Sequence, residues 1–153
     1  MHHKNLENYP NGIIVYSYNK GYYYDSKKKM YYLGELIDYS EESFKNLIGD
    51  AKIYLNNRCY ALSKALNMPI NNVKIKNFKS RWGSCDVNKN ISLNYKLIML
   101  PKDTIDYVII HELCHTKYFN HQKNFHILLT KLSNNEKQHK KTLKYFNFIL
   151  KIY

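Results

Sequence analysis

The sequence has few of the features that define secreted or membrane proteins. Its 153 residues include three cysteines, Cys59, Cys85 and Cys114, with no CxxC pair. They cannot form a disulfide framework, which fits a reducing compartment. No apolar run approaches the length of about 18 residues needed to cross a bilayer, and the opening MHHKNLENYPNG does not resemble a signal peptide. We therefore expect a cytoplasmic protein with no membrane partner.

Acidic residues and arginine are also scarce. The chain has 24 Lys+Arg against 12 Asp+Glu, a formal charge of +12, yet Arg58 and Arg81 are its only arginines. Such a charge predicts weak, sequence-independent association with nucleic acid at low salt. The lysines accompany abundant Asn, Tyr and Ile, as expected from AT-rich codon use, so a merely solvated surface is the favoured explanation for them. No Gly-rich phosphate loop, recognition helix or stacking motif indicates a dedicated nucleic-acid site.

The most informative segment is HELCHTKYFNH, residues 111–121, which carries an HExxH motif. Residues four apart lie on one face of a helix, so His111 and His115 can bind one metal ion. Glu112 lies beside that ion and is the candidate general base, because it can accept a proton from a metal-activated water. The preceding apolar run DTIDYVII, with a start signal at Asp103 or Thr104, predicts that the motif lies on a buried helix.

A third histidine, His121, follows His115 by six residues. A straight helix would turn it away from the other two rings, so the chain must break between them. Asn120 tolerates the left-handed conformation that such a break can use. Three histidines leave one zinc position open for water, which is typical of catalytic rather than structural zinc. The sequence therefore predicts one zinc ion per chain, bound by His111, His115 and His121.

The rest of the chain predicts an α+β fold. Tyr-rich runs over residues 13–39 (IIVYSY, GYYYD and MYYLGEL), separated by polar turns, indicate a hairpin or small meander. Apolar residues at three- and four-residue steps over residues 40–66 predict a long helix. Alternating residues 73–75 and 91–97 predict strands of an antiparallel-type sheet around RWGSC and a turn at residues 86–90. Two helices should follow the zinc helix, near residues 125–132 and 143–150.

Residues 79–125 carry a resemblance to a known family. Their RWGSC turn, ISLN strand, Pro-led connection, YVIIHELCH helix and NHQKNF segment resemble the core of the YgjP-like zinc metallopeptidases. The resemblance implies a small zincin-like fold related to the SprT-like proteases, with zinc on the three histidines and Glu112 as catalytic acid and base. The length of 153 residues predicts one domain over residues 1–153. Within it, the resemblance implies that residues 1–39 are a shortened N-terminal β region and that residues 40–153 form the catalytic core.

Several further residues are candidates for substrate binding, for stabilising the oxyanion or for supporting the site. Arg81 and Trp82 combine one of two arginines with the only tryptophan, so they either support the active site or contact substrate. Tyr118 and His126, with Arg81, are candidates for the oxyanion stabiliser. Weaker rivals as metal ligands are Glu136, His126 and His139.

The predicted function is hydrolysis of peptide bonds in a protein or peptide substrate. Two alternatives remain open. The same zinc and water could hydrolyse nucleotides or other phosphoanhydrides, because a ligand set determines the metal chemistry and not the bond that is cut. A non-enzymatic nucleic-acid-binding module with structural zinc would need a fourth protein ligand, which the sequence does not supply. The sequence leaves the oligomeric state open.

Overall fold

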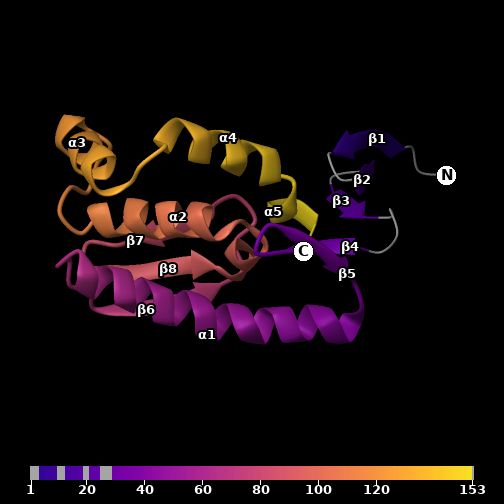
Figure 1. The fold of residues 1–153 in the computed structure, drawn as a ribbon, viewed down its shortest axis with the longest axis horizontal. Coiled ribbons are helices and arrows are strands. Elements are labelled where there is room, and N and C mark those ends of the chain that lie inside the picture. The colour runs from indigo at the N-terminus through magenta and orange to yellow at the C-terminus, as the bar shows by residue number, and fades with distance from the viewer. Residues whose placement is uncertain (1–3, 10–12, 19–20, 25–28, 153) are drawn as a thin grey trace.

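The computed structural model describes residues 4–9, 13–18, 21–24 and 29–152, which form an α+β fold (Figure 1). The strands are β1 (Lys4–Tyr9), β2 (Ile13–Tyr18), β3 (Gly21–Tyr24), β4 (Lys29–Tyr32), β5 (Glu35–Asp38), β6 (Asn72–Lys76), β7 (Gly83–Cys85) and β8 (Asn90–Asn94). The helices are α1 (Glu41–Ala65), α2 (Lys102–Cys114), α3 (Lys123–Leu132), α4 (Glu136–Phe146) and α5 (Ile149–Ile152), with a 3-10 helix η3 (Tyr95–Met99).

The N-terminal strands form two small antiparallel units. Strands β1, β2 and β3 are a meander, and β4 pairs with β5 as a hairpin. The predicted hairpin or meander is thus confirmed, although β1 was not predicted and MYYLGEL is two strands rather than one run. Leu33 and Gly34 both have positive φ and form the two-residue turn between β4 and β5. The turn residues expected at 11–12, 19–20 and 25–28 lie outside the described residues.

Helix α1 lies within the range predicted for it, residues 40–66, and begins with a side-chain cap. The hydroxyl of Ser40 accepts a hydrogen bond from the Ser43 amide, and the Ser43 hydroxyl accepts one from the Ser40 amide. This reciprocal cap satisfies two N–H groups at the start of the helix. Leu47, Ala51 and Leu55 then repeat on the buried face at four-residue steps. The predicted long helix is confirmed.

The central sheet has the strand order β6-β8-β7 and is mixed. β7 runs antiparallel to β8, but β6 pairs with β8 in parallel, so the predicted antiparallel arrangement was wrong for that pair. The strand predicted over residues 91–97 also ends earlier, at Asn94, where η3 begins. The Asn94 side chain accepts a hydrogen bond from the Lys96 amide and thereby starts the 3-10 turn.

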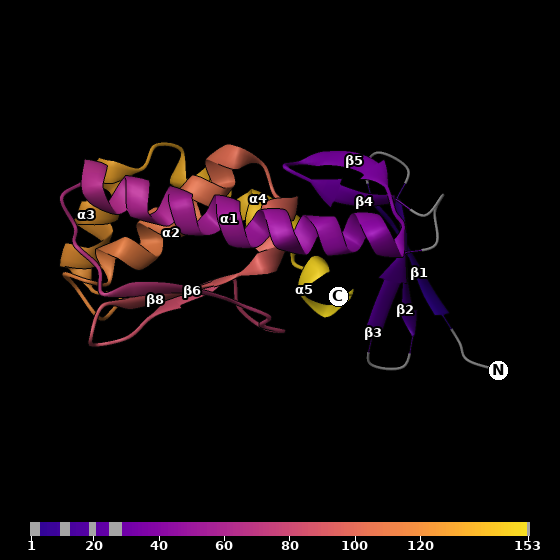
Figure 2. The same ribbon diagram turned by 90° about the horizontal axis from the view of Figure 1, so that it is seen from below.

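Helices α1 and α2 lie side by side against the same face of this sheet (Figure 2). Arg58 of α1 and Asp106 of α2 join them through two hydrogen bonds of 2.7 Å. Ile91 and Leu93 of β8 point into this layer and are fully buried. The sheet and α1 therefore hold α2 in a fixed orientation, which positions the HExxH motif.

The C-terminal segment forms α3, α4 and α5, so the last predicted helix is in fact two. Asn135 adopts a left-handed conformation, with φ of 60°, directly before α4. α4 packs on α2, and α5 lies beside β3 (Figure 1). Within the described ranges, no helix is both long and apolar enough to cross a membrane.

Candidate metal centre

The HExxH residues occupy the C-terminal end of α2. Ile105, Ile109 and Leu113 are fully buried and repeat at four-residue steps. This repeat holds α2 in the core and directs His111 and His115 to another face. The helix ends at Cys114, with His115 as its C-cap residue. A break before His121 was therefore predicted correctly, but it does not use Asn120, which is not among the described residues with positive φ.

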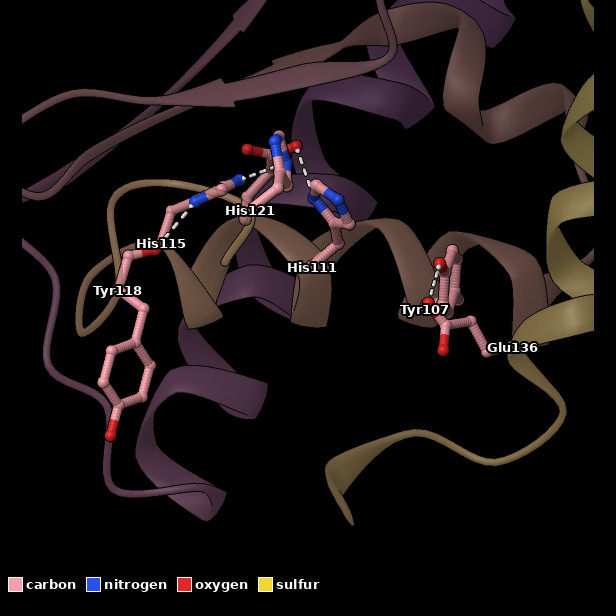
Figure 3. Close-up of polar contacts among 7 residues, drawn as sticks. Tyr107, His111, His115, Tyr118, His121 and Glu136 are labelled. Atoms are coloured by element: carbon pink, nitrogen blue, oxygen red, sulfur yellow. Dashed lines mark hydrogen bonds and ion pairs between the residues drawn. The ribbon is translucent and has the colours of Figure 1, made fainter. Parts of the chain in front are cut away.

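The loop after α2 brings His121 back to the other two histidines. One ring nitrogen from each of His111, His115 and His121 lies within 4.8 Å of the others. The Nδ1 atom of His115 is 3.0 Å from the backbone oxygen of Tyr118, which can only accept, so Nδ1 donates this hydrogen bond and Nε2 is the atom left to bind a metal. That Nε2 lies 3.0 Å from Nε2 of His121 (Figure 3). The two nitrogens thus converge as they would on a shared cation.

Phe125, the third residue of α3, is the packing centre of the three rings. It is fully buried and stacks on His115, with ring centroids 4.4 Å apart. Its edge-to-face contacts with His111 and His121 have centroid distances of 5.0 and 4.9 Å. Sequence reasoning assigned Phe125 only to a helical core. The HQKNF spacing was the available signal, because Phe125 follows His121 by only four residues.

Glu112 lies between the histidines and the edge strand β7. Its side chain is 9 % exposed, and Oε2 is 3.3 Å from Nδ1 of His111. A Cβ atom at Gly83 would lie 3.2 Å from Cγ of Glu112 and 3.2 Å from the backbone oxygen of Ser92. Glycine in the RWGSC segment therefore allows β7 to approach the glutamate closely. Gly83 was another residue whose role the sequence pattern did not show.

Asn94 explains why the RWGSC segment takes a defined shape. Its side chain is fully buried and donates hydrogen bonds to the backbone oxygens of Phe78 and Arg81, at 2.8 and 3.0 Å. The backbone N–H of Asn94 donates a third hydrogen bond, to the backbone oxygen of Trp82, at 2.9 Å. Since buried carbonyl groups need partners, these bonds fix the chain that leads into β7. Sequence reasoning assigned Asn94 only to a strand face, and the ISLN pattern was its only signal.

The electrostatic environment favours a neutral His121 and protonated thiols. Burial and the neighbouring His115 and His111 lower the pKa of His121, and the neutral ring is the form that binds metal. Burial, with Glu112 adding to it, raises the pKa of Cys85 to about 11. Burial also raises the pKa of Cys114 to about 11. These cysteines are free, as predicted, and uncharged near neutral pH.

The other candidate residues lie around the triad rather than in it. The Arg81 guanidinium is 5.4 Å from the centroid of the Phe78 ring, and Trp82 is half-buried against the core. The Tyr118 ring points away from the three histidines, although its carbonyl binds His115 (Figure 3). His126 is exposed, with its ring centroid 6.5 Å from that of His121.

The rival ligands on α4 make other contacts. Glu136 accepts a hydrogen bond of 3.5 Å from the Tyr107 hydroxyl and pairs with Lys140 at 3.3 Å (Figure 3). His139 is buried and stacks on Tyr107, with ring centroids 5.0 Å apart. Among the residues that the structure describes, neither joins the group of possible metal ligands.

The three imidazole nitrogens are suited to a divalent transition metal such as zinc. Imidazole nitrogen is a ligand for zinc, copper, iron and nickel, whereas magnesium and calcium prefer oxygen. No fourth His, Cys, Asp or Glu of the described ranges belongs to the group. With protein ligands from three residues, a coordination position remains for water or substrate. The residues therefore fit a metal centre that can take part in hydrolysis.

The chain is similar in part to two solved metallopeptidase structures. No curated protein matches the chain. One of these structures is the zymogen of jannalysin, a metallopeptidase of Methanocaldococcus jannaschii. Its sequence is 25 % identical and the TM-score is 0.44; the similar region includes 69 % of this chain and 95 % of the jannalysin chain. The zymogen of abylysin, a metallopeptidase of Pyrococcus abyssi, is 18 % identical with a TM-score of 0.48, covering 69 % of this chain and 96 % of its own.

The family of this chain follows from a match to a protein-family model, and not from these two structures. The model of the YgjP-like metallopeptidase domain matches residues 19–146. This range includes the HExxH helix, His121 and the whole central sheet. The chain belongs to the YgjP-like metallopeptidase family and is a peptidase.

Proposed function

We propose that the protein is a zinc peptidase that binds one zinc ion through His111, His115 and His121. The convergence of three ring nitrogens within 4.8 Å is the observation that supports this proposal most directly. When bound, zinc would lower the pKa of a water molecule toward about 7 and polarise the carbonyl group of the substrate.

Glu112 is the general base in this proposal. Its carboxylate adjoins His111, one of the proposed ligands, and is almost fully buried, which supports this role. It takes a proton from the attacking water and passes it to the leaving amine, which breaks the peptide bond. The hydrogen bond from His115 to the Tyr118 carbonyl fixes the orientation of one ligand ring.

The position of β7 at the edge of the sheet is an argument for a polypeptide substrate. It pairs with β8 on one side only, and Gly83 brings it against Glu112. An extended peptide can add to such an edge by main-chain hydrogen bonds, which places its backbone beside the general base. Peptides N-methylated beside the scissile bond should therefore have a raised KM, whereas side-chain methylation at the same positions should change KM little.

Zinc content of two histidine variants tests the ligand set. His121→Ala should lose most bound zinc because it removes one of three protein ligands. His126→Ala is the matched control, since His126 is a neighbouring exposed histidine outside the group, and it should keep one zinc per chain. Metal analysis after gel filtration measures both. Equal zinc content in the two variants would contradict the assignment of His121.

Activity of Glu112→Gln tests the proposed base. The amide has nearly the same shape but cannot take a proton, so hydrolysis should fall about 10²–10⁴-fold while zinc content stays unchanged. Unfolded protein and nucleoside triphosphates should be assayed in parallel with the wild-type enzyme. Near-full activity of the variant would exclude Glu112 as the base. Zinc-dependent turnover of the triphosphates alone would contradict a peptidase.

A further inference from the structure

Helix α4 carries a row of lysines that the proposed reaction does not use. Lys137, Lys140, Lys141 and Lys144 are all exposed. Each of them lies three residues from one of the others and four residues from another, so they share one face of the helix. Lys140 pairs with Glu136, and no carboxylate of the described residues lies within ion-pair distance of the other three. This basic face, defined as these four lysines, therefore keeps most of its charge free.

The basic face differs from the longest helix, α1, which carries three lysines. In its 25 residues α1 mixes Lys45, Lys52 and Lys64 with acidic residues, Glu41, Glu42 and Asp50. α4 is 11 residues long, and Glu136 is its only acid. The net charge of the molecule is thus not spread evenly, since α4 concentrates it on one short surface.

The opposite side of α4 is fixed to the body of the protein. His139 stacks on Tyr107 of α2 and lies 3.4 Å from the Thr104 hydroxyl, and Phe146 contacts Tyr31 edge to face. These contacts hold the opposite face of α4 against the protein, so the exposed lysines face solvent. Helix α4 itself lies on the side of α2 away from the central sheet (Figure 1). The row is therefore presented on a rigid helix and not on a loose tail.

The composition of the face distinguishes among anionic partners. Membrane-surface helices expose large apolar residues beside their cations, whereas α4 buries or half-buries Leu143, Tyr145 and Phe146. Protein interfaces are depleted of lysine at their centres and enriched in aromatic residues. Lysines without exposed apolar residues are suited to phosphate groups, which need charge and little else.

We propose that the basic face of α4 binds the phosphate backbone of nucleic acid without reading its sequence. Successive lysines on this face are one helical turn apart or less, so they can contact neighbouring phosphates along one strand. The face has no arginine and no exposed aromatic residue, the groups that would read or stack on bases. This binding is independent of the peptidase reaction and uses none of its residues.

A pair of triple variants tests the location of binding. One replaces Lys137, Lys141 and Lys144 by Gln, and the control replaces Lys45, Lys52 and Lys64 of α1 by Gln. Each removes three charges and lowers the formal charge from +12 to +9. Fluorescence anisotropy with a mixed-sequence DNA duplex then measures affinity against salt. Each phosphate contact contributes about 0.9 to the steepness of the plot of log K against log salt, so loss of three contacts should make the slope of the α4 variant shallower by about 2.7. The slope of the α1 variant should change much less.

Lysine footprinting of the wild-type protein gives a test that no folding defect can affect. Acetylation followed by mass spectrometry should show Lys137, Lys140, Lys141 and Lys144 protected when the duplex is added. Protection at other lysines instead, or equal loss of slope in both triple variants, would overturn the proposal in favour of incidental net charge. Competition by polyglutamate as strong as that by DNA at equal charge would overturn the assignment to phosphate.

Discussion

At the scale of single residues, the active-site geometry depends on side chains that the HExxH pattern does not include. Phe125 packs against all three histidines, and Asn94 fixes the segment before β7. Gly83 leaves room for Glu112. These residues touch no reacting atom in the proposed mechanism, so their effect on activity is through the position of those that do.

Gly83→Ala should reduce peptidase activity without releasing zinc. The new methyl group would lie 3.2 Å from both Glu112 and the Ser92 carbonyl, so the strand or the glutamate must shift. A shift of the general base should lower kcat at least about tenfold. Gly49→Ala in α1 is the control, because nothing lies within 4 Å of its Cβ position. It should keep full activity and gain up to about 1 kcal/mol in stability. Full activity in Gly83→Ala would rule out this role.

At the scale of elements, η3 contains a buried cation that ties separate segments together. Lys96 is fully buried, and its Nζ donates to the backbone oxygens of Leu150 at 2.8 Å and Phe78 at 3.3 Å. These contacts join η3 to α5 and to the loop that precedes β7. Burial, with a smaller contribution from Lys79, lowers the pKa of Lys96 to about 8.

The lowered pKa of Lys96 predicts how stability depends on pH. Between about pH 8 and 10 the unfolded chain keeps the Lys96 proton while the folded chain releases it, so the free energy of unfolding should rise with pH. Lys96→Met should abolish this contribution, whatever its effect on absolute stability. Urea unfolding of both proteins at several pH values in this window measures the difference. Parallel pH profiles would show that Lys96 does not titrate there.

At the scale of the whole molecule, a bound metal should hold together the end of α2, the loop after it and the start of α3. The three proposed ligands come from the end of α2 and from the segment just before α3. A ligand that binds only the folded state stabilises it in proportion to the logarithm of its concentration over Kd. Metal binding should therefore contribute to the stability of the protein as well as to catalysis.

Removal of the metal should lower the melting temperature of the wild-type protein. At a free zinc concentration of about 100 Kd the loss would be about 2.7 kcal/mol, and added zinc should restore it. His121→Ala is the control, and chelation should leave its melting temperature almost unchanged because little metal is bound. Calorimetry with and without chelator measures both. An unchanged wild-type melting temperature after verified zinc loss would contradict this coupling.

Local patterns in the sequence were sufficient for the elements that carry the site. The long helix α1, the buried helix that carries HExxH and the turn at residues 86–90 were all predicted correctly, because each depends on residues close in the chain. The need for a break before His121 also followed from helix geometry alone. The resemblance to the YgjP-like family, which the family model confirms, likewise came from motif residues in the sequence.

Only the tertiary structure decided how these elements meet. The parallel pairing of β6 with β8 and the early end of β8 at Asn94 depend on contacts between distant segments, which residue periodicity does not record. The same holds for Gly83 against Glu112 and Phe125 among the histidines. The sequence by itself determined the candidate metal ligands, since imidazole spacing on a helix is a local property. Their packing and the exposure of the α4 lysines required the folded chain, because burial depends on residues far apart in sequence.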